Sequence, residues 1–133
     1  MISEKKNHRK KILAVLDDLF FSSKIREAAN TLDIDLEFVK KPDGFSEKIS
    51  SEKPSLIIFD LNSRAGSPLE IIRSIKSSSE LKKIPVIGFL SHVQIELKKE
   101  ADRAGCDLVI PRSRFSKDLR EILRKYSVPP AEG

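Results

Sequence analysis

The stretch PSLIIFD at residues 54–60 is the clearest strand signal in the chain. Four consecutive apolar residues, Leu56 to Phe59, follow a short polar segment and end at a carboxylate, Asp60. A continuous apolar run without polar alternation is typical of a strand that is buried on both faces, as in a parallel sheet. The stretch therefore predicts a buried strand with an ionisable group at its carboxyl end.

Similar apolar runs occur before and after this strand and alternate with amphipathic helical patterns. We predict five strands, at residues 12–16, 36–39, 54–60, 85–90 and 106–110. We predict helices over residues 20–32, from 45, from 67, over 91–104 and from 116. This alternation indicates the α/β class: a five-stranded parallel sheet with helices on both faces, of the flavodoxin-like type.

Helix boundaries and core positions also follow from the pattern. Ser67 and Ser91 each begin a four-residue segment with the spacing of a capping box, and Ser116 is predicted to cap the last helix. Gly105 is expected to end the helix before the fifth strand. The predicted buried strand residues are Leu16, Ile57, Ile58, Val86, Ile87, Val109 and Ile110.

Length and composition indicate one globular domain of 133 residues, with 39% hydrophobic and 34% charged residues. One cysteine excludes an internal disulfide and a cysteine-based metal cluster. No apolar run approaches the roughly 20 residues that span a bilayer, so no membrane insertion is expected. We expect a cytoplasmic protein with a basic tail at residues 1–10, a folded domain at 11–126, a disordered tail at 127–133 and no output domain.

The net charge of +5 is concentrated near the two ends of the chain. Residues 1–11 carry five basic side chains and one acidic, and residues 98–125 carry nine basic and five acidic. A basic patch could bind nucleic acid through Lys5, Lys6, Arg9, Lys10 and Lys11, or it could be a solvated, solubilising surface. With one tyrosine and no tryptophan to stack on bases, we favour the second interpretation and do not expect nucleic acid as a partner.

Polar residues just beyond the strands' carboxyl ends are the candidate site residues, because parallel α/β sheets form their sites there. Asp60 follows one strand, and Asp17 and Asp18 follow another. A carboxylate in this place serves as a metal ligand or as a nucleophile for phosphoryl transfer, and a hard cation such as Mg²⁺ relieves the repulsion between neighbouring carboxylates. The alternative is that these carboxylates only cap the helices that follow them.

Four segments in this order carry a family resemblance: ILAVLDD at 12–18, PSLIIFDLN at 54–62, IPVIGFLSH at 84–92 and AGCDLVIPRS at 104–113. Over roughly residues 11–126 the chain resembles response-regulator receiver domains. The resemblance implies that Asp60 is the phosphoacceptor. It also implies a Mg²⁺ site made by Asp17, Asp60 and the backbone carbonyl of Asn62.

The chain departs from the family pattern at positions that bind metal or switch conformation. Leu16 stands at the first acidic position, and Leu90 stands at the switch Ser/Thr position, with Ser91 one residue late. Arg112, followed by Ser113, replaces the family's lysine and cis-proline, and Val109 replaces the switch aromatic. An acidic pair of Asp17 and Asp18 would need a shifted register, against which the apolar run argues. We therefore expect Mg²⁺ binding to be weak or absent, and phosphorylation to be weakly coupled to conformation.

The resemblance implies a stand-alone receiver-like signalling module of a two-component phosphorelay, not an enzyme, with a histidine kinase or phosphotransfer protein as its partner. The alternative is a phosphorylation-independent pseudo-receiver that acts as a protein–protein adaptor. A metal-dependent phosphohydrolase is less well supported, because nothing positions a water or a general base. The expected interaction face, which could also form a homodimer, is the last helix with the strand and helix before it, and it includes the basic residues Arg114, Lys117, Arg120 and Arg124.

Overall fold

The chain forms a five-stranded, wholly parallel sheet in a computed structural model that describes residues 10–40, 43–63, 67–92 and 94–127. The strand order is β2-β1-β3-β4-β5. This is the flavodoxin-like order, and it confirms the predicted fold class. The strands are β1 (Lys11–Val15), β2 (Asp35–Val39), β3 (Leu56–Asp60), β4 (Val86–Leu90) and β5 (Leu108–Pro111).

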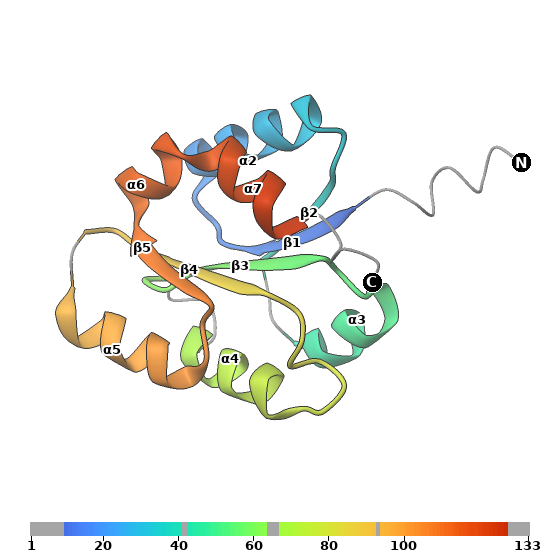
Figure 1. The fold of residues 1–133 in the computed structure, drawn as a ribbon, viewed down its shortest axis with the longest axis vertical. Coiled ribbons are helices and arrows are strands. Elements are labelled where there is room, and N and C mark those ends of the chain that lie inside the picture. Colours follow the sequence, from blue (N-terminus) through green and yellow to red (C-terminus); the bar gives the residue numbers. More distant parts are fainter. Residues whose placement is uncertain (1–9, 41–42, 64–66, 93, 128–133) are drawn as a thin grey trace, which may run out of the picture.

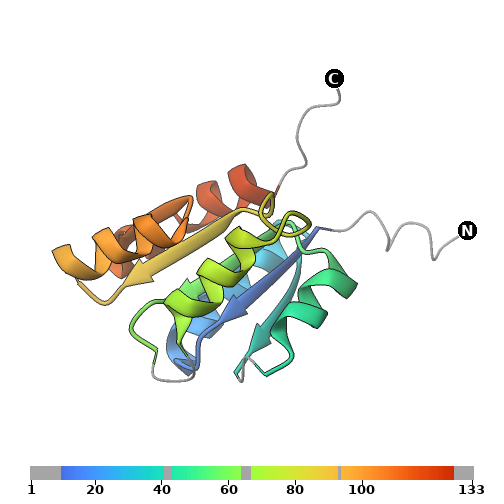
Figure 2. The same cartoon turned by 90° about the horizontal axis from the view of Figure 1, so that it is seen from below.

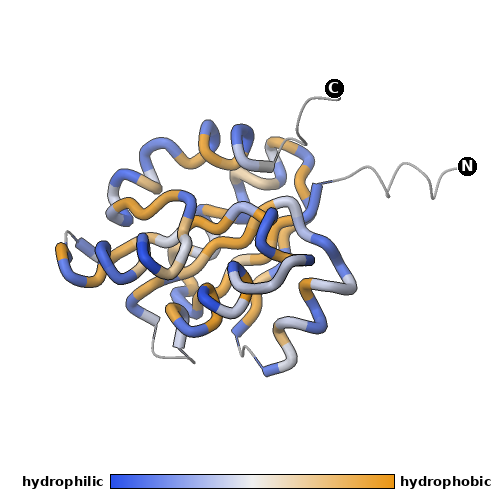
Figure 3. The backbone as a smooth tube through the Cα atoms, turned by 60° about the horizontal axis from the view of Figure 1, so that its bottom comes forward, coloured by the Kyte–Doolittle hydropathy of each residue, from blue (hydrophilic) through white to orange (hydrophobic). Residues whose placement is uncertain are grey.

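Helices cover both faces of this sheet (Figures 1 and 2). One face carries α2 (Leu19–Thr31), α6 (Arg112–Lys117) and α7 (Leu119–Ser127). The other carries α3 (Phe45–Glu52), α4 (Pro68–Ser77) and α5 (Ile95–Ala104). Figure 3 shows the strands as hydrophobic segments between helices of mixed hydropathy. The predicted tails at residues 1–10 and 127–133 lie almost entirely outside the described residues.

Most of the predicted core is confirmed. Ile57, Ile58, Val86 and Ile87 are fully buried, and Val109 is buried as well. Leu16 is buried but lies directly after β1 rather than within it. The prediction that Ile110 is buried is wrong: it is half-buried, because β5 is an edge strand with a neighbour on one side only.

The predicted helix starts are only partly correct. Ser67 is the N-cap residue of α4 as predicted, but its side chain makes no capping hydrogen bond. The N-cap residue of α5 is Gln94 rather than Ser91, also without a side-chain capping bond. Ser116 lies inside α6 instead of capping the last helix, because α6 already begins after Pro111. Gly105 ends α5 as predicted, with a φ of 112° that suits glycine.

A single lysine joins three segments at the opposite end of the sheet from Asp60. Lys76 Nζ donates to the carbonyl oxygens of Lys82 at 3.1 Å and Ile84 at 2.8 Å, and to Asp107 Oδ2 at 2.9 Å. The same carboxylate oxygen accepts the Val86 N–H at 2.8 Å. The Lys76 side chain is only 15% exposed, so water replaces these partners poorly if the ammonium is removed.

Replacing Lys76 with methionine keeps the apolar stem and removes all three donated hydrogen bonds. We expect the free energy of unfolding in urea to fall by about 1–2 kcal/mol, because hydrogen bonds to charged groups contribute more than neutral ones. Lys98→Met is the matched control, since the ion pair of Lys98 with Asp102 is about half exposed and should contribute little. Equal losses in the two variants would contradict the assigned role of Lys76.

Candidate functional site

Asp60, at the end of β3, is a buried carboxylate with 6% of its surface exposed. Its Oδ1 accepts the backbone N–H of Asn62 at 2.9 Å, and its Oδ2 lies 3.9 Å from Nη2 of Arg112. Burial raises the pKa of Asp60 above its ordinary value, against the lowering effects of Asn62 and Arg112. The negative charges of Asp17 and Asp18 raise this pKa further, so three carboxylates share one edge of the sheet.

Arg112 begins α6 directly after β5 and is shared between two carboxylates. Its Nη1 lies 3.4 Å from Asp18 Oδ2, and its Nη2 faces Asp60. The guanidinium carbon lies 5.4 Å from the ring centre of Phe21 and 5.8 Å from that of Phe89. A flat guanidinium can contact aromatic rings and carboxylates together, which a lysine ammonium does less well.

Three buried phenylalanines form a cluster, and two of them, Phe21 and Phe89, contact this arginine. Phe89 stacks on Phe115 with ring centres 5.4 Å apart, and Phe21 packs edge-on against Phe89 at 5.0 Å. Phe21 also lies 5.8 Å from Phe115. The sequence pattern places Phe21 on a buried helix face but does not predict this cluster, because its members come from α2, β4 and α6. Only the predicted adjacency of these elements could have indicated it.

The two aspartates after β1 have different roles. Asp18 caps α2, since its Oδ1 accepts the Phe21 N–H at 3.1 Å, and its other oxygen faces Arg112. Asp17, the residue that the sequence assigned to the metal, is exposed. Leu16 belongs to the core cluster that contains Phe21, so a core side chain stands where the family has its first acid. The contact with Arg112 adds Asp18 to the site.

The predicted switch positions offer few polar groups. Leu90 and Val109 are both buried in the core on the α3–α5 side of the sheet. Ser91 is exposed, and its backbone N–H donates to Oδ1 of Asn62 at 2.7 Å. Asn62 therefore contacts both the end of β3 and the residue after β4.

A glycine positions the turn that follows Asp60. A Cβ added to Gly88 of β4 would lie 2.7 Å from Cδ1 of Leu61, so only glycine lets this buried leucine pack against the neighbouring strand. The Leu61 N–H donates to the carbonyl of Phe89 at 3.0 Å. These two contacts hold the segment from Asp60 to Asn62 against β4.

The oxygen ligands at this edge suit a hard divalent cation in kind but not in number. Asp17 and Asp60 offer carboxylates, the ligand type that Mg²⁺ prefers. Within the described ranges, no group of three or more His, Cys, Asp and Glu side chains is placed to hold a metal ion. Arg112 contacts Asp60 and is a competing positive charge. The two oxygens of Asp18 already face the Phe21 N–H and Arg112, so Asp17 and Asp60 are the two carboxylates left to hold a divalent cation.

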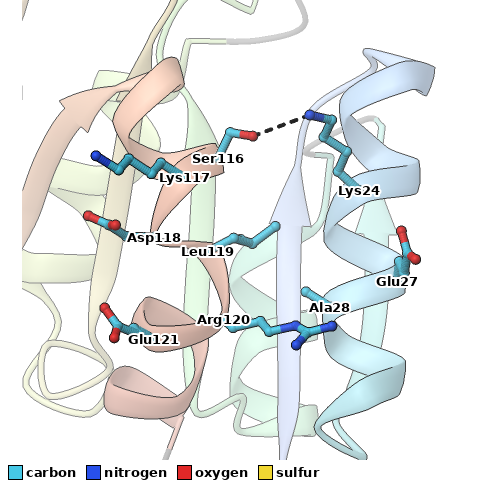
Figure 4. Close-up of a pocket in the computed structure, with 9 residues that line it drawn as sticks. All are labelled: Lys24, Glu27, Ala28, Ser116, Lys117, Asp118, Leu119, Arg120 and Glu121. Carbon is cyan, nitrogen blue, oxygen red and sulfur yellow. Dashed lines mark hydrogen bonds between the residues drawn. The ribbon is translucent and has the colours of Figure 1, made fainter.

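The predicted interaction face is exposed but less uniformly basic than its sequence suggests. Arg114, Lys117, Arg120 and Arg124 are all exposed on α6 and α7. A groove of about 590 Å³ between α2 and these helices mixes basic and acidic side chains: Lys24, Lys117, Arg120, Glu27, Asp118 and Glu121 (Figure 4).

Two large apolar side chains that sequence analysis did not single out are also exposed near the site. Leu19 is 75% exposed and Phe20 is 74% exposed, and both directly follow Asp18. Exposed apolar side chains of this size gathered in one place often mark a protein–protein contact. Among the helices that the structure describes, none is long and apolar enough to cross a bilayer.

Comparison with known proteins identifies the family. No protein-family model matches the chain. The chain is 33% identical over 134 aligned positions to response regulator Rcp1 of Synechocystis sp. (strain PCC 6803), covering 92% of this chain and 90% of that protein. It superposes on the phosphorylated cyanobacterial phytochrome response regulator RcpA with a TM-score of 0.79 and 23% identity, covering 92% of this chain and 99% of the other. On the Mn²⁺-bound form of Rcp1 the TM-score is 0.77 with 20% of superposed residues identical, covering 93% and 99%.

The sequence similarity covers nearly the full length of both proteins, and the same overall fold accompanies it. The chain belongs to the response-regulator receiver family.

Proposed function

We propose that this receiver takes part in a two-component phosphorelay by accepting a phosphoryl group on Asp60. The observation that carries the proposal is a buried carboxylate at the end of β3 whose Oδ2 faces a guanidinium. A carboxylate oxygen of Asp60 attacks the donor's phosphorus, the bond from phosphorus to the donor atom breaks, and the leaving group takes a proton. Arg112 stabilises the negative charge on the phosphoryl oxygens.

A divalent cation, when bound, neutralises charge on the transferred group. Asp17 and Asp60, with the backbone carbonyl of Asn62, would hold it here. We propose that this binding is weak, because Leu16 provides no carboxylate at its position and Arg112 competes with the cation for Asp60. The related Rcp1 has a Mn²⁺-bound form, which supports divalent binding at some level.

Phosphorylation is expected to change the conformation of this chain only slightly. Leu90 offers no hydroxyl to a phosphoryl group, and the side chain of Val109 lies in the core on the α3–α5 side of the sheet. A ligand shifts a conformational equilibrium only by its differential contacts with the two states. The few contacts available here therefore predict weak coupling.

The proposed partners are a histidine kinase or phosphotransfer protein and a protein that contacts the exposed surface of α6 and α7. Acidic side chains of that protein would contact the exposed Arg114, Lys117, Arg120 and Arg124. The alternative is that a second copy of this chain binds the same helices to form a homodimer. Leu19 and Phe20, close to the site, suit the apolar part of a protein contact. The single cysteine suits a reducing compartment, so we propose a cytoplasmic location.

A phosphorylation-independent adaptor is the second candidate function. One observation favours it: Arg112 already pairs with both Asp18 and Asp60, so the site is held together without a phosphoryl group. In that case the receiver fold would serve only to present its helices to a partner.

Intact-mass measurement after incubation with a small-molecule phosphodonor and Mg²⁺ separates the two candidates. We expect slow addition of one phosphoryl group to the wild type and none to Asp60→Asn. Asp35→Asn is the matched control, because Asp35 is an exposed aspartate at the opposite end of the strands, and it should behave as the wild type. No addition to the wild type would favour the adaptor, and addition to Asp60→Asn would place the phosphoacceptor elsewhere.

Asp60→Asn should also change how stability depends on pH. Because burial raises the pKa of Asp60 in the folded state, the ionised carboxylate destabilises the fold. This penalty is absent below the ordinary aspartate pKa of about 4 and complete above the raised folded pKa. The variant should therefore be more stable than the wild type in urea at pH 7, with the difference shrinking towards pH 4. A less stable variant at pH 7 would contradict this.

Binding to nucleic acid is expected to be weak. The positive charge of exposed basic side chains near the carboxyl end is partly neutralised, since Arg114 pairs with Asp118 at 3.0 Å and Lys98 with Asp102 at 2.9 Å. We expect no sub-micromolar affinity for duplex DNA at physiological salt, measured by fluorescence anisotropy across a salt series. Deleting residues 1–10 should make the affinity for DNA depend less steeply on salt concentration. Tight, salt-resistant binding to a defined DNA sequence would contradict this expectation.

A further inference from the structure

Asn62 is bonded to two strands at once. Its backbone N–H donates to Asp60 Oδ1 at 2.9 Å, and its side-chain Oδ1 accepts the Ser91 backbone N–H at 2.7 Å. The second bond joins residues 29 apart in sequence and lies at the short end of the range for N–H···O hydrogen bonds. A chain of hydrogen bonds thus runs from the carboxylate to the first residue after β4.

The Ser91 N–H is a donor that a phosphoryl group on Asp60 could use. A phosphoryl group adds up to two negative charges and three strong acceptor oxygens, which need donors. Asp60 pairs with Phe89 in the sheet, so Ser91 lies just past the end of the strand beside it. Leu90 offers no side-chain donor, which leaves the backbone N–H of Ser91 as a donor on this side of the site.

We propose that Asn62 is a positioning residue: its side-chain oxygen accepts the Ser91 N–H that a phosphoryl oxygen on Asp60 would otherwise accept. The bond fixes the segment after β4 in one position before phosphorylation, and a phosphoryl group must displace the Asn62 amide to reach this donor. Asn62 therefore opposes phosphoryl binding and reduces the movement that phosphorylation produces. This inference rests on the proposed function of Asp60.

Asn62→Ala tests the proposal, because it removes the side-chain acceptor and keeps the backbone N–H that binds Asp60. Asn62→Asp keeps an acceptor oxygen in the same position. Ser67→Ala is the control, because this exposed side chain near the same loop makes no capping hydrogen bond. Two quantities are measured by NMR on the full chain: hydrogen exchange of the Ser91 amide without ligand, and affinity for beryllofluoride in the presence of Mg²⁺.

We expect the Ser91 amide to exchange about fivefold faster in Asn62→Ala, and at the wild-type rate in Asn62→Asp and in Ser67→Ala. Beryllofluoride should bind about fivefold more tightly to Asn62→Ala than to the wild type, since no internal bond has to break. A purely structural role for Asn62 would weaken this binding or leave it unchanged.

Unchanged Ser91 exchange in Asn62→Ala overturns the inference. Faster exchange with unchanged or weaker beryllofluoride binding overturns the proposed competition. If neither the wild type nor Asn62→Ala responds to beryllofluoride while Ser91 exchange does change, the failure lies with the function proposed for Asp60, and the competition falls with it.

Discussion

Ile58→Ala is expected to lower the free energy of unfolding by about 2–5 kcal/mol, the usual cost of truncating a core aliphatic side chain. Ile58 lies in β3 and is fully buried. It stands between Ala14 of β1 and Ile87 of β4 in the sheet, in the core cluster that includes residues of α2 and α7. Neighbours on two strands and an overlying helix layer limit how far the structure can close the cavity, so the loss should be large.

Urea denaturation followed by circular dichroism measures this change, with Ile95→Ala as the control. Ile95 is 65% exposed at the start of α5, so its truncation should change stability by less than about 0.5 kcal/mol. A loss well below 1 kcal/mol for Ile58→Ala would contradict its place in the core.

Leu16→Asp is expected to tighten Mg²⁺ binding by about ten- to hundredfold. The variant supplies a carboxylate at the position where the family has its first acid, beside Asp17 and Asp60. Two unit charges about 4 Å apart attract by roughly 1–4 kcal/mol between the dielectric of water and that of a protein surface. The expected tenfold to hundredfold change, about 1.4–2.8 kcal/mol, lies within that range. The attraction between the new carboxylate and Mg²⁺ offsets the repulsion between Mg²⁺ and the positive charge of Arg112.

Leu16 is 2% exposed, so the same substitution also removes an apolar side chain from the core. Leu16→Asn is therefore the matched control: it loses the same apolar contacts without adding a charge. Calorimetry on the folded variants measures the affinity, since the chain has no tryptophan to report binding by fluorescence. Equal affinities of Leu16→Asp and Leu16→Asn would contradict the account, as would tight Mg²⁺ binding by the wild type.

The sheet could be predicted from sequence because its information is local. Apolar runs such as Leu56 to Phe59 and Val86 to Leu90 mark strands that are buried on both faces, and they alternate with helical patterns that force parallel connections. Ser67 is the N-cap residue of α4 as predicted, but its side chain makes no capping hydrogen bond, whereas the N-cap residue of α5 is Gln94, three residues after the predicted cap Ser91. Ser91 instead contacts Asn62 through its backbone N–H, a contact between residues 29 apart that local sequence does not report.

The site could be predicted only in part for the same reason. Asp60 follows from the end of an obvious strand, and the apolar run up to Leu16 favours Asp17 over the shifted pair, but the sequence did not predict the contact of Asp18 with Arg112. In the structure Asp18 occupies the N-cap of α2, and its other oxygen faces Arg112. The contacts of Arg112 with Phe21 and Phe89 join segments that are distant in sequence, and no spacing rule reports them.

The most direct test of Asp60 as the phosphoacceptor of a receiver with few switch contacts is an NMR titration of the ¹⁵N-labelled chain, first with Mg²⁺ and then with beryllofluoride as a phosphoryl mimic. We predict small shifts with Mg²⁺ that do not saturate readily, and then larger shifts with beryllofluoride at Asp60, Asn62 and Arg112, with little change along α7. An amide spectrum that stays unchanged throughout the titration would contradict the account and leave the phosphorylation-independent adaptor in its place.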